Sequence, residues 1–235
     1  MKNIRHIFRK EFKSYFISPI AYIVISVFLI IIGWLFFSTF FLEKQANLTK
    51  FFSLLPVTFA FIIPAVTMRL FSEEINIGSY ELLITLPVSF RDIILGKFLA
   101  AVAFVALMLS PTLVYALSTS FLGDLDWGPV IGGYLGAILL GASFSSIGLL
   151  ASSFTRNQVV AFIIGMAICF SLTLLVDFVL FFIPNFMVDF FQFLSANLHF
   201  QNIAKGVIDL RDIMYFVSIT FIALYTTHLV IEEKK

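Results

Sequence analysis

The sequence has 235 residues, of which 60% are hydrophobic and 12% are charged, and its mean hydropathy is +1.04. A soluble domain carries about 25% charged residues, so this composition excludes a soluble protein and indicates an integral membrane protein. The formal net charge of +1 argues against a nucleic-acid partner, and a single cysteine, Cys169, excludes an internal disulfide and a cysteine-based metal site.

The first predicted element is an amphipathic helix over residues 2–17. Its basic residues fall on the face opposite its apolar residues, which is typical of a helix in the headgroup layer. The apolar residues are Ile4, Ile7, Phe8, Phe12, Tyr15 and Phe16, and the basic residues are Lys2, Arg5, Arg9, Lys10 and Lys13. The alternative is a basic tail that only sets the membrane topology. No cleavable signal peptide is expected, because no small-residue cleavage site follows the first apolar run.

Six apolar segments are long enough to cross a membrane, since a transmembrane helix needs about 20 apolar residues to cross ~30 Å. The predicted spans are 19–42, 51–71, 98–122, 129–153, 158–183 and 212–231. With a cytoplasmic N-terminus, eleven of the 15 lysines and arginines fall on the inside and four on the outside. Because positive charges favour the cytoplasmic side, both termini are expected there.

Two spans contain residues that affect helix shape and packing. The second span contains Pro56 and Pro64 and should be kinked. The fourth span carries a stripe of small residues at four-residue spacing, from Gly133 to Ser145, on which another helix can pack closely. This stripe serves packing within the chain or a dimer interface, and we favour packing within the chain.

A charged segment, residues 69–97, lies between the second and third spans and holds seven of the 29 charged residues. Each charge at the bilayer centre costs roughly 2.5–3.5 kcal/mol, so this segment must lie in water at one membrane face. Ser72 with the acids after it predicts a helix start, and Gly78 predicts a break. A second short helix is expected over 80–86, ended by Pro87. The two helices would present carboxylates to a cytoplasmic partner.

The connection before the last span also differs from a simple loop. Beyond Asp177 come two apolar pieces that are each too short to cross, which predicts two half-length helices that enter the outer leaflet and return over 178–208. Asp177 either faces a pathway or lies at its outer mouth, and we favour the mouth. His199 has no partners at metal-ligand spacing, so we interpret it as a polar interfacial residue.

Motifs for enzymatic chemistry are absent from the sequence. It contains no phosphate-binding P-loop, no HExxH, no GxSxG and no glycine-rich dinucleotide turn. Charged residues are almost absent from the spans, which argues against a proton relay. We therefore do not expect an enzyme, and any energy for transport must come from a partner.

The charged segment and several shorter motifs together form a recognisable pattern. FSEE at 71–74 is followed by GSYELL at 78–83, Pro87 and GK at 96–97. With the N-terminal helix, six spans and broken outer segment, this order resembles the ABC-2-type transporter permeases. In the charged segment, Ser79 follows Gly78 at a position where the gliding-motility-associated branch of that family usually has threonine. The shorter motifs resemble this branch. They are SPI at 18–20, IPAVTMR at 63–69, NQVVAFII at 157–164, NLHF at 197–200 and GVIDLRD at 206–212.

The resemblance implies an all-α integral membrane protein whose membrane domain is like that of type V ABC exporters. It implies a single transmembrane domain over 1–235, in the bacterial inner membrane. This domain would have an N-terminal in-plane amphipathic helix at 2–17, six transmembrane helices, a cytoplasmic coupling region at 72–97 and a re-entrant outer segment at 178–208. The expected function is that of a permease subunit, which couples ATP hydrolysis by a separate subunit to export or to conformational work across the membrane.

The resemblance also implies partners and contact residues. Two copies of an ATP-binding subunit would carry ATP and Mg, and this chain would hold no cofactor or metal. These subunits would dock on Glu73, Glu74, Gly78 and Glu81. The translocation path between two permeases, either two copies or two related chains, would include Thr58, Thr67, Ser171, Thr173 and Asp177. Membrane lipid and a protein with a large extracytoplasmic domain are further expected partners.

Two other functions stay open at this point. A passive channel or facilitator would use the charged segment only as a solvated loop, and it would need polar rings inside the spans, of which the sequence shows few. A structural membrane anchor for a surface machine would share the contact with an ATPase. The sequence does not separate such an anchor from an exporter, and it does not identify a substrate.

Overall fold

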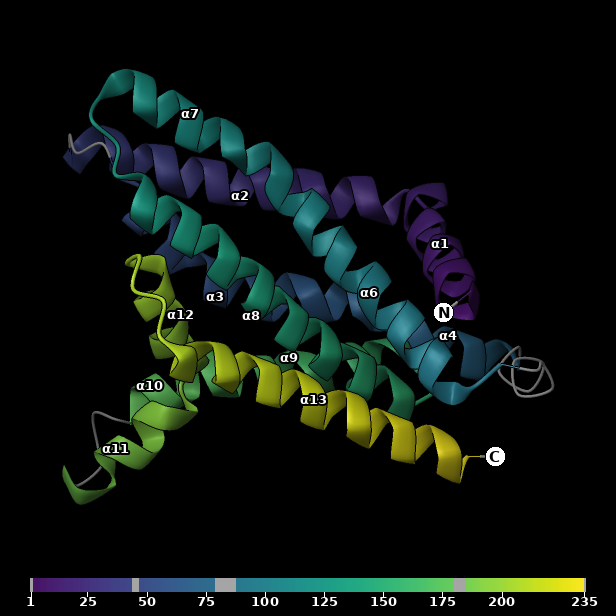
Figure 1. The fold of residues 1–235 in the computed structure, drawn as a ribbon. Helices are drawn as coiled ribbons and strands as arrows, with labels where there is room; N and C mark the ends of the chain where they lie inside the picture. The colour runs from purple at the N-terminus through teal and green to yellow at the C-terminus, as the bar shows by residue number, and fades with distance from the viewer. Residues whose placement is uncertain (1, 44–46, 79–87, 180–184, 235) are drawn as a thin grey trace.

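The computed structural model describes residues 2–43, 47–78, 88–179 and 185–234, and within these ranges the chain is helical without strands (Figure 1). The helices are α1 (Lys2–Ile17), α2 (Ile20–Glu43), α3 (Thr49–Thr67), α4 (Arg69–Ile77), α6 (Phe90–Leu109), η1 (Ser110–Thr112), α7 (Leu113–Leu122), α8 (Trp127–Phe154), α9 (Gln158–Phe170), η2 (Ser171–Leu175), α10 (Val176–Val179), α11 (Asn185–Leu194), α12 (Ala196–Ala204) and α13 (Leu210–Glu233). The predicted all-helical class is confirmed.

Five helical segments are long and apolar enough to cross a membrane. They are Ile20–Ser38, Thr49–Ile77, Phe90–Leu122, Trp127–Phe154 and Leu210–Glu233. The sixth predicted span, 158–183, corresponds to α9, the π-helical turn η2 and α10, and its apolar part over Gln158–Leu174 is shorter than the other five. Its role as a span therefore stays a prediction.

Helix α8 lies at the centre of the bundle and packs against α3, α6, α9, α12 and α13 (Figure 1). Its small residues make this possible: a methyl group at Gly133 would overlap the ring of Phe52, and one at Gly141 would lie 2.7 Å from Cγ1 of Val105. Within a membrane such close packing is a main source of helix association, because lipid is as apolar as the side chains. The favoured interpretation of the stripe, packing within the chain, is confirmed.

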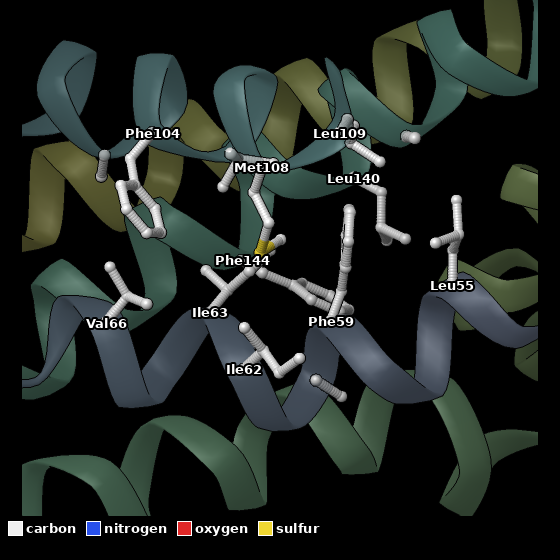
Figure 2. Packing of buried hydrophobic residues seen from close by; sticks show 14 of the residues in the cluster. Leu55, Phe59, Ile62, Ile63, Val66, Phe104, Met108, Leu109, Leu140 and Phe144 are labelled. Carbon is white, nitrogen blue, oxygen red and sulfur yellow. The ribbon is translucent and has the colours of Figure 1, made fainter. Parts of the chain in front are cut away.

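Apolar side chains of α3, α6 and α8 fill the interior between the helices (Figure 2). Phe59 and Ile63 of α3 and Met108 of α6 are almost fully buried, and Phe144 of α8 completes the layer. These side chains belong to one buried apolar cluster that α3, α6 and α8 share.

The predicted helix start at Ser72 is wrong. Helix α4 begins at Arg69 and continues α3 almost without a break, and Ser72 lies inside it. The hydroxyl of Ser72 is buried and donates to the carbonyl oxygen of Met68 at 2.5 Å, the bond that a serine inside a helix makes to its own preceding turn. The predicted stop at Gly78 is confirmed, since its φ of 79° is a left-handed conformation that suits glycine.

The two ends of the bundle differ. Both termini lie at the same end as α4, whereas α10, α11 and α12 lie at the opposite end (Figure 1). The short helices α11 and α12 fall inside the predicted outer segment of 178–208, and how deeply they enter a membrane stays a prediction. The predicted second helix of the charged segment, over 80–86, lies outside the described residues.

The packing of α12 on α8 generates a first prediction. A methyl group at Gly132 would overlap the carbonyl oxygen of Ile203, and a backbone atom cannot swing aside as a side chain can. Gly132→Ala should therefore destabilise the protein by about 1–3 kcal/mol, in spite of the better helix propensity of alanine. Thermal unfolding in detergent, followed by size-exclusion chromatography, measures this.

The matched control is Gly136→Ala on the same helix. There the methyl group would lie 3.2 Å from Cγ2 of Ile203, a side-chain atom that can shift, so the loss of stability should be clearly smaller. Equal unfolding midpoints for the two variants would contradict the close backbone contact between α8 and α12.

Candidate functional site

Helices α1, α4 and α6 meet at the end of the bundle that holds both termini (Figure 1). The close approach of α1 to α6 depends on Gly96, because a methyl group there would lie 2.7 Å from Cγ2 of Ile7. The apolar face of the predicted amphipathic helix thus packs on α6. Its basic residues Arg5, Arg9 and Lys13 are exposed.

A buried lysine joins these three helices. Lys97 of α6 is 1% exposed, and its ammonium group lies 2.9 Å from Oε1 of Glu74 on α4 and 3.2 Å from Oε1 of Glu11 on α1. It also donates to the carbonyl oxygen of Leu70 at 2.7 Å. An ammonium has three N–H donors, so these three acceptors satisfy it completely. We call Lys97, Glu11 and Glu74 the Lys97 cluster.

The Lys97 cluster has an aromatic side and an exposed cationic side. The ammonium of Lys97 lies 5.1 Å from the centre of the Phe71 ring, within the range of a cation–π contact. On the exposed side, Nζ of Lys10 lies 3.7 Å from Oε1 of Glu11 and 3.8 Å from Oε1 of Glu74. Lys10 is mostly exposed, so its pairs contribute little compared with those of the buried Lys97.

A second cation belongs to the same end of the bundle. The guanidinium carbon of Arg69 lies 5.2 Å from the centre of the buried Tyr15 ring, which packs on Phe104 at 5.0 Å. Burial raises the pKa of the Tyr15 hydroxyl, so this side chain stays a neutral phenol at physiological pH. A pocket of about 240 Å³ opens here, lined by residues of the Lys97 cluster together with Tyr15 and Arg69.

The structure separates the predicted docking residues. Glu74 points inward to Lys97 and its side chain is 15% exposed. Glu73 is half-buried, lines the pocket and makes no ion pair among the described residues. Gly78 is exposed at the end of α4, and Glu81 lies outside the described residues. Of the predicted acids that the structure describes, Glu73 is therefore the one left to meet a partner.

The comparison with protein families identifies the kind of protein to which these helices belong. The family model described as "ABC-2 family transporter protein" matches residues 5–231, nearly the whole chain. The chain belongs to the ABC-2 transporter family. A search of curated proteins found no match. The predicted ABC-2 resemblance is confirmed at the level of the family, and membership of the gliding-motility branch stays a prediction.

Family membership makes this chain a membrane-spanning permease subunit of an ABC transporter, which works with an ATP-binding subunit. The described part of the chain contains no group of three histidine, cysteine or carboxylate residues that could hold a metal ion. Among the described residues of this ABC-2 permease, the buried ionisable side chains that pair lie near the ends of the bundle, while buried serine and threonine hydroxyls are found along its helices.

The predicted path residues of this permease are not gathered around one cavity. The hydroxyls of Thr67 and Thr173 are buried and donate within their own helices, to Ile63 at 2.8 Å and to Cys169 at 2.9 Å. Thr58 donates to Leu54 at 2.8 Å and lines an apolar groove of about 420 Å³ between α2 and α3. Ser171 lies half-buried in η2; Asp177 lies in α10, and the structure does not describe its side chain.

A second polar cluster at the opposite end of the permease was missed from the sequence. Nδ1 of His199 on α12 lies 2.5 Å from Oδ1 of Asp212 on α13, and Nε2 lies 3.0 Å from the carbonyl oxygen of Phe193. The sequence shows no partner of His199 at metal-ligand spacing, and this carboxylate thirteen residues later was not predicted; the interpretation of His199 as a polar interfacial residue stays a prediction. No signal in the sequence indicates this pair, because the two side chains are thirteen residues apart and lie on different helices.

The Lys97 cluster generates a second prediction. Lys97→Met replaces the lysine with an unbranched apolar side chain one heavy atom shorter and leaves two carboxylates near each other without the buried cation. Removing one partner of a buried ion pair costs about 3–5 kcal/mol, so the permease should unfold at a clearly lower temperature. Adding Glu74→Gln to Lys97→Met should recover part of this loss, because it removes one of the two charges.

The control for this experiment is Arg91→Met, which removes an exposed cation from the first turn of the same helix. Its effect on stability should stay within about 0.5 kcal/mol. If Lys97→Met and Arg91→Met had the same thermal midpoint in detergent, the cluster would not hold α1, α4 and α6 together.

Proposed function

We propose that this permease subunit couples ATP hydrolysis on a separate subunit to export, or to conformational work, across the bacterial inner membrane. The observation that carries the proposal is the Lys97 cluster, in which one ammonium binds the N-terminal helix, the end of the second apolar segment and the start of the next. A displacement of α4 by a partner would therefore move the ends of α1 and α6 with it.

The ATP-binding subunits, which hold ATP and Mg, would dock where α4 ends. Glu73 and Gly78 are available there, while Glu74 holds Lys97 in place. Glu73 makes no ion pair among the described residues, so it suits a basic side chain of the partner. Both termini lie at this end, in keeping with the cytoplasmic position that the distribution of lysine and arginine favours (Figure 1).

The assembly would contain two ATP-binding subunits and two permeases, the second being another copy or a related chain. Helix α1 would lie in the plane of the membrane surface and present Arg5, Arg9 and Lys13 to anionic headgroups. The helices α11 and α12 would form the re-entrant outer segment. A partner with a large extracytoplasmic domain, as in the gliding-motility branch, would contact the permease at that end.

The docking proposal is tested by Glu73→Lys. Placing a like charge against a basic partner surface costs several kcal/mol, so the amount of ATP-binding subunit that co-purifies with the tagged permease should fall at least about tenfold. ATP hydrolysis in the purified assembly should fall with it. The thermal midpoint of the permease alone should not change, because Glu73 is outside the Lys97 cluster.

The matched control is Asp124→Lys, the same charge reversal at an exposed position between α7 and α8. This change should leave co-purification and hydrolysis as in the unmodified permease. Undiminished ATPase binding by the Glu73→Lys permease would show that α4 does not form the docking surface.

A further inference from the structure

An apolar groove of about 550 Å³ lies between α13 and α11, at the end of the bundle opposite to the termini. Met214, Ser218 and Ile222 line it along one face of α13, and Phe193 lines it from α11. Its volume is in the range of small-molecule sites. Arg211, in the first turn of α13, is the one charged residue among its described lining residues.

The dimensions of the groove match one leaflet of a bilayer. From Arg211 to Ile222 the helix rises roughly 16 Å, at about 1.5 Å per residue. One leaflet contributes about half of a hydrocarbon core that is ~30 Å thick. The charged end of the groove lies where α13 begins, and its apolar length runs toward the middle of the span. This is the layout of a phospholipid, with a headgroup at the surface and an acyl chain below it.

The groove opens on a surface that already suits lipid. On α13, Met214, Val217, Phe221 and Ile222 are each about half exposed or more, with Phe221 at 69%. An apolar helix face of this kind in a transmembrane protein contacts hydrocarbon chains. Lipid of the bilayer can therefore enter the groove directly from the hydrocarbon that surrounds this helix face.

Hydrogen bonds fix the wall of the groove. The hydroxyl of Tyr215 donates to the carbonyl oxygen of Leu194 at 2.6 Å, and Nε2 of His199 contacts the carbonyl oxygen of Phe193 at 3.0 Å. The ring of His199 also stacks on Tyr215 with 4.1 Å between centres. The α11 residues that line the groove are thus tied to α12 and α13, so the groove is a built feature of the fold.

The two acids near Arg211 in the sequence both have other hydrogen-bond partners. The side chain of Asp209 caps α13 by accepting from the backbone N–H of Arg211 at 3.0 Å, and Asp212 is paired with His199. No ion pair of the Arg211 guanidinium is found among the described residues. An arginine at the end of an apolar groove matches a phosphate oxygen, which it can bind through two parallel hydrogen bonds.

We propose that this groove binds an anionic phospholipid of the surrounding bilayer, with the phosphate on Arg211 and one acyl chain along α13 between Met214 and Ile222. The site goes beyond ATP coupling, since it needs neither the ATP-binding subunit nor the Lys97 cluster. A lipid held there would fasten α11 to α13 and fill the space between them.

The test is native mass spectrometry of the full-length chain in a neutral detergent, titrated with phosphatidylglycerol or with phosphatidylcholine of the same acyl chains. The unmodified chain should retain phosphatidylglycerol in preference to phosphatidylcholine. Arg211→Gln should weaken this retention by at least about tenfold, because it removes the charge and both hydrogen bonds. Arg211→Lys keeps the charge but not the bidentate geometry, so its retention should lie between that of the unmodified chain and that of Arg211→Gln.

Two further variants separate the headgroup from the acyl chain. Lys205→Gln removes an exposed cation that follows α12 and does not line the groove, so retention should be unchanged. Ser218→Trp fills the groove but keeps Arg211, so retention of phosphatidylglycerol should fall by a similar factor. Ser218 is exposed, and size-exclusion chromatography would check that this variant still folds.

Several results would overturn the proposal. Equal retention of the two lipids, no retention by the unmodified chain, or unchanged retention by Arg211→Gln would each exclude an anionic lipid bound at Arg211. Unchanged retention by Ser218→Trp would exclude the acyl-chain position. A chain dimer that Ser218→Trp disrupts, without retained lipid, would instead assign the groove to a second copy.

Discussion

The ammonium group of Lys97 constrains the end of the bundle at which the chain starts and finishes. A buried charge is costly unless it is paired and fully hydrogen-bonded, and here Lys97 of α6 finds its three acceptors on two other helices, α1 and α4. None of these helices can move far alone without leaving a charge unsatisfied. The N-terminal helix is therefore held to α4 through Lys97, and Gly96 allows it to lie close to α6. In a permease that works with an ATP-binding subunit, the Lys97 cluster would connect the proposed docking surface on α4 to the start of α6.

The remainder of the bundle follows from a different constraint, the close packing of α8. Its glycines admit Phe52 and Val105 and the backbone around Ile203, so neighbouring helices contact it without gaps. The interior is mainly apolar, with buried serine hydroxyls on α8 that donate to backbone carbonyl oxygens, and the buried ionisable side chains that pair lie near the two ends. At one end the Lys97 cluster joins α1, α4 and α6, and at the other the pair of His199 and Asp212 joins α12 to α13. The second pair also supports the groove beside Arg211, so at each end a buried pair of ionisable side chains lies near a more exposed basic residue.

Sequence patterns predicted the elements better than the contacts between them. Long apolar runs identified five spans, and Gly78 identified the end of α4, because length and backbone conformation are local properties. Ser72 misled the prediction, since a serine before two acids favours a helix start only where no helix already arrives from the preceding span. The partners of Lys97 and of His199 could not be predicted, because pairing depends on how helices far apart in the sequence are arranged. The helix predicted over residues 2–17 is present as α1, but its pattern did not distinguish an apolar face on lipid from one on α6, and its place in the headgroup layer stays a prediction.

The central claim is that α1 and α4 move as one unit because Lys97 joins them. Its most direct test is a spin-label distance between α1 and α4, with labels at the exposed positions Lys13 and Asn76 of the transporter assembled with its ATP-binding subunit. The native Cys169 is buried, which leaves the two introduced cysteines for labelling. We expect one narrow distribution of the distance between the two labels, the same with ATP and with ADP, and a broad distribution after Lys97→Met. A distance that changes with the nucleotide in the unmodified cluster would contradict it.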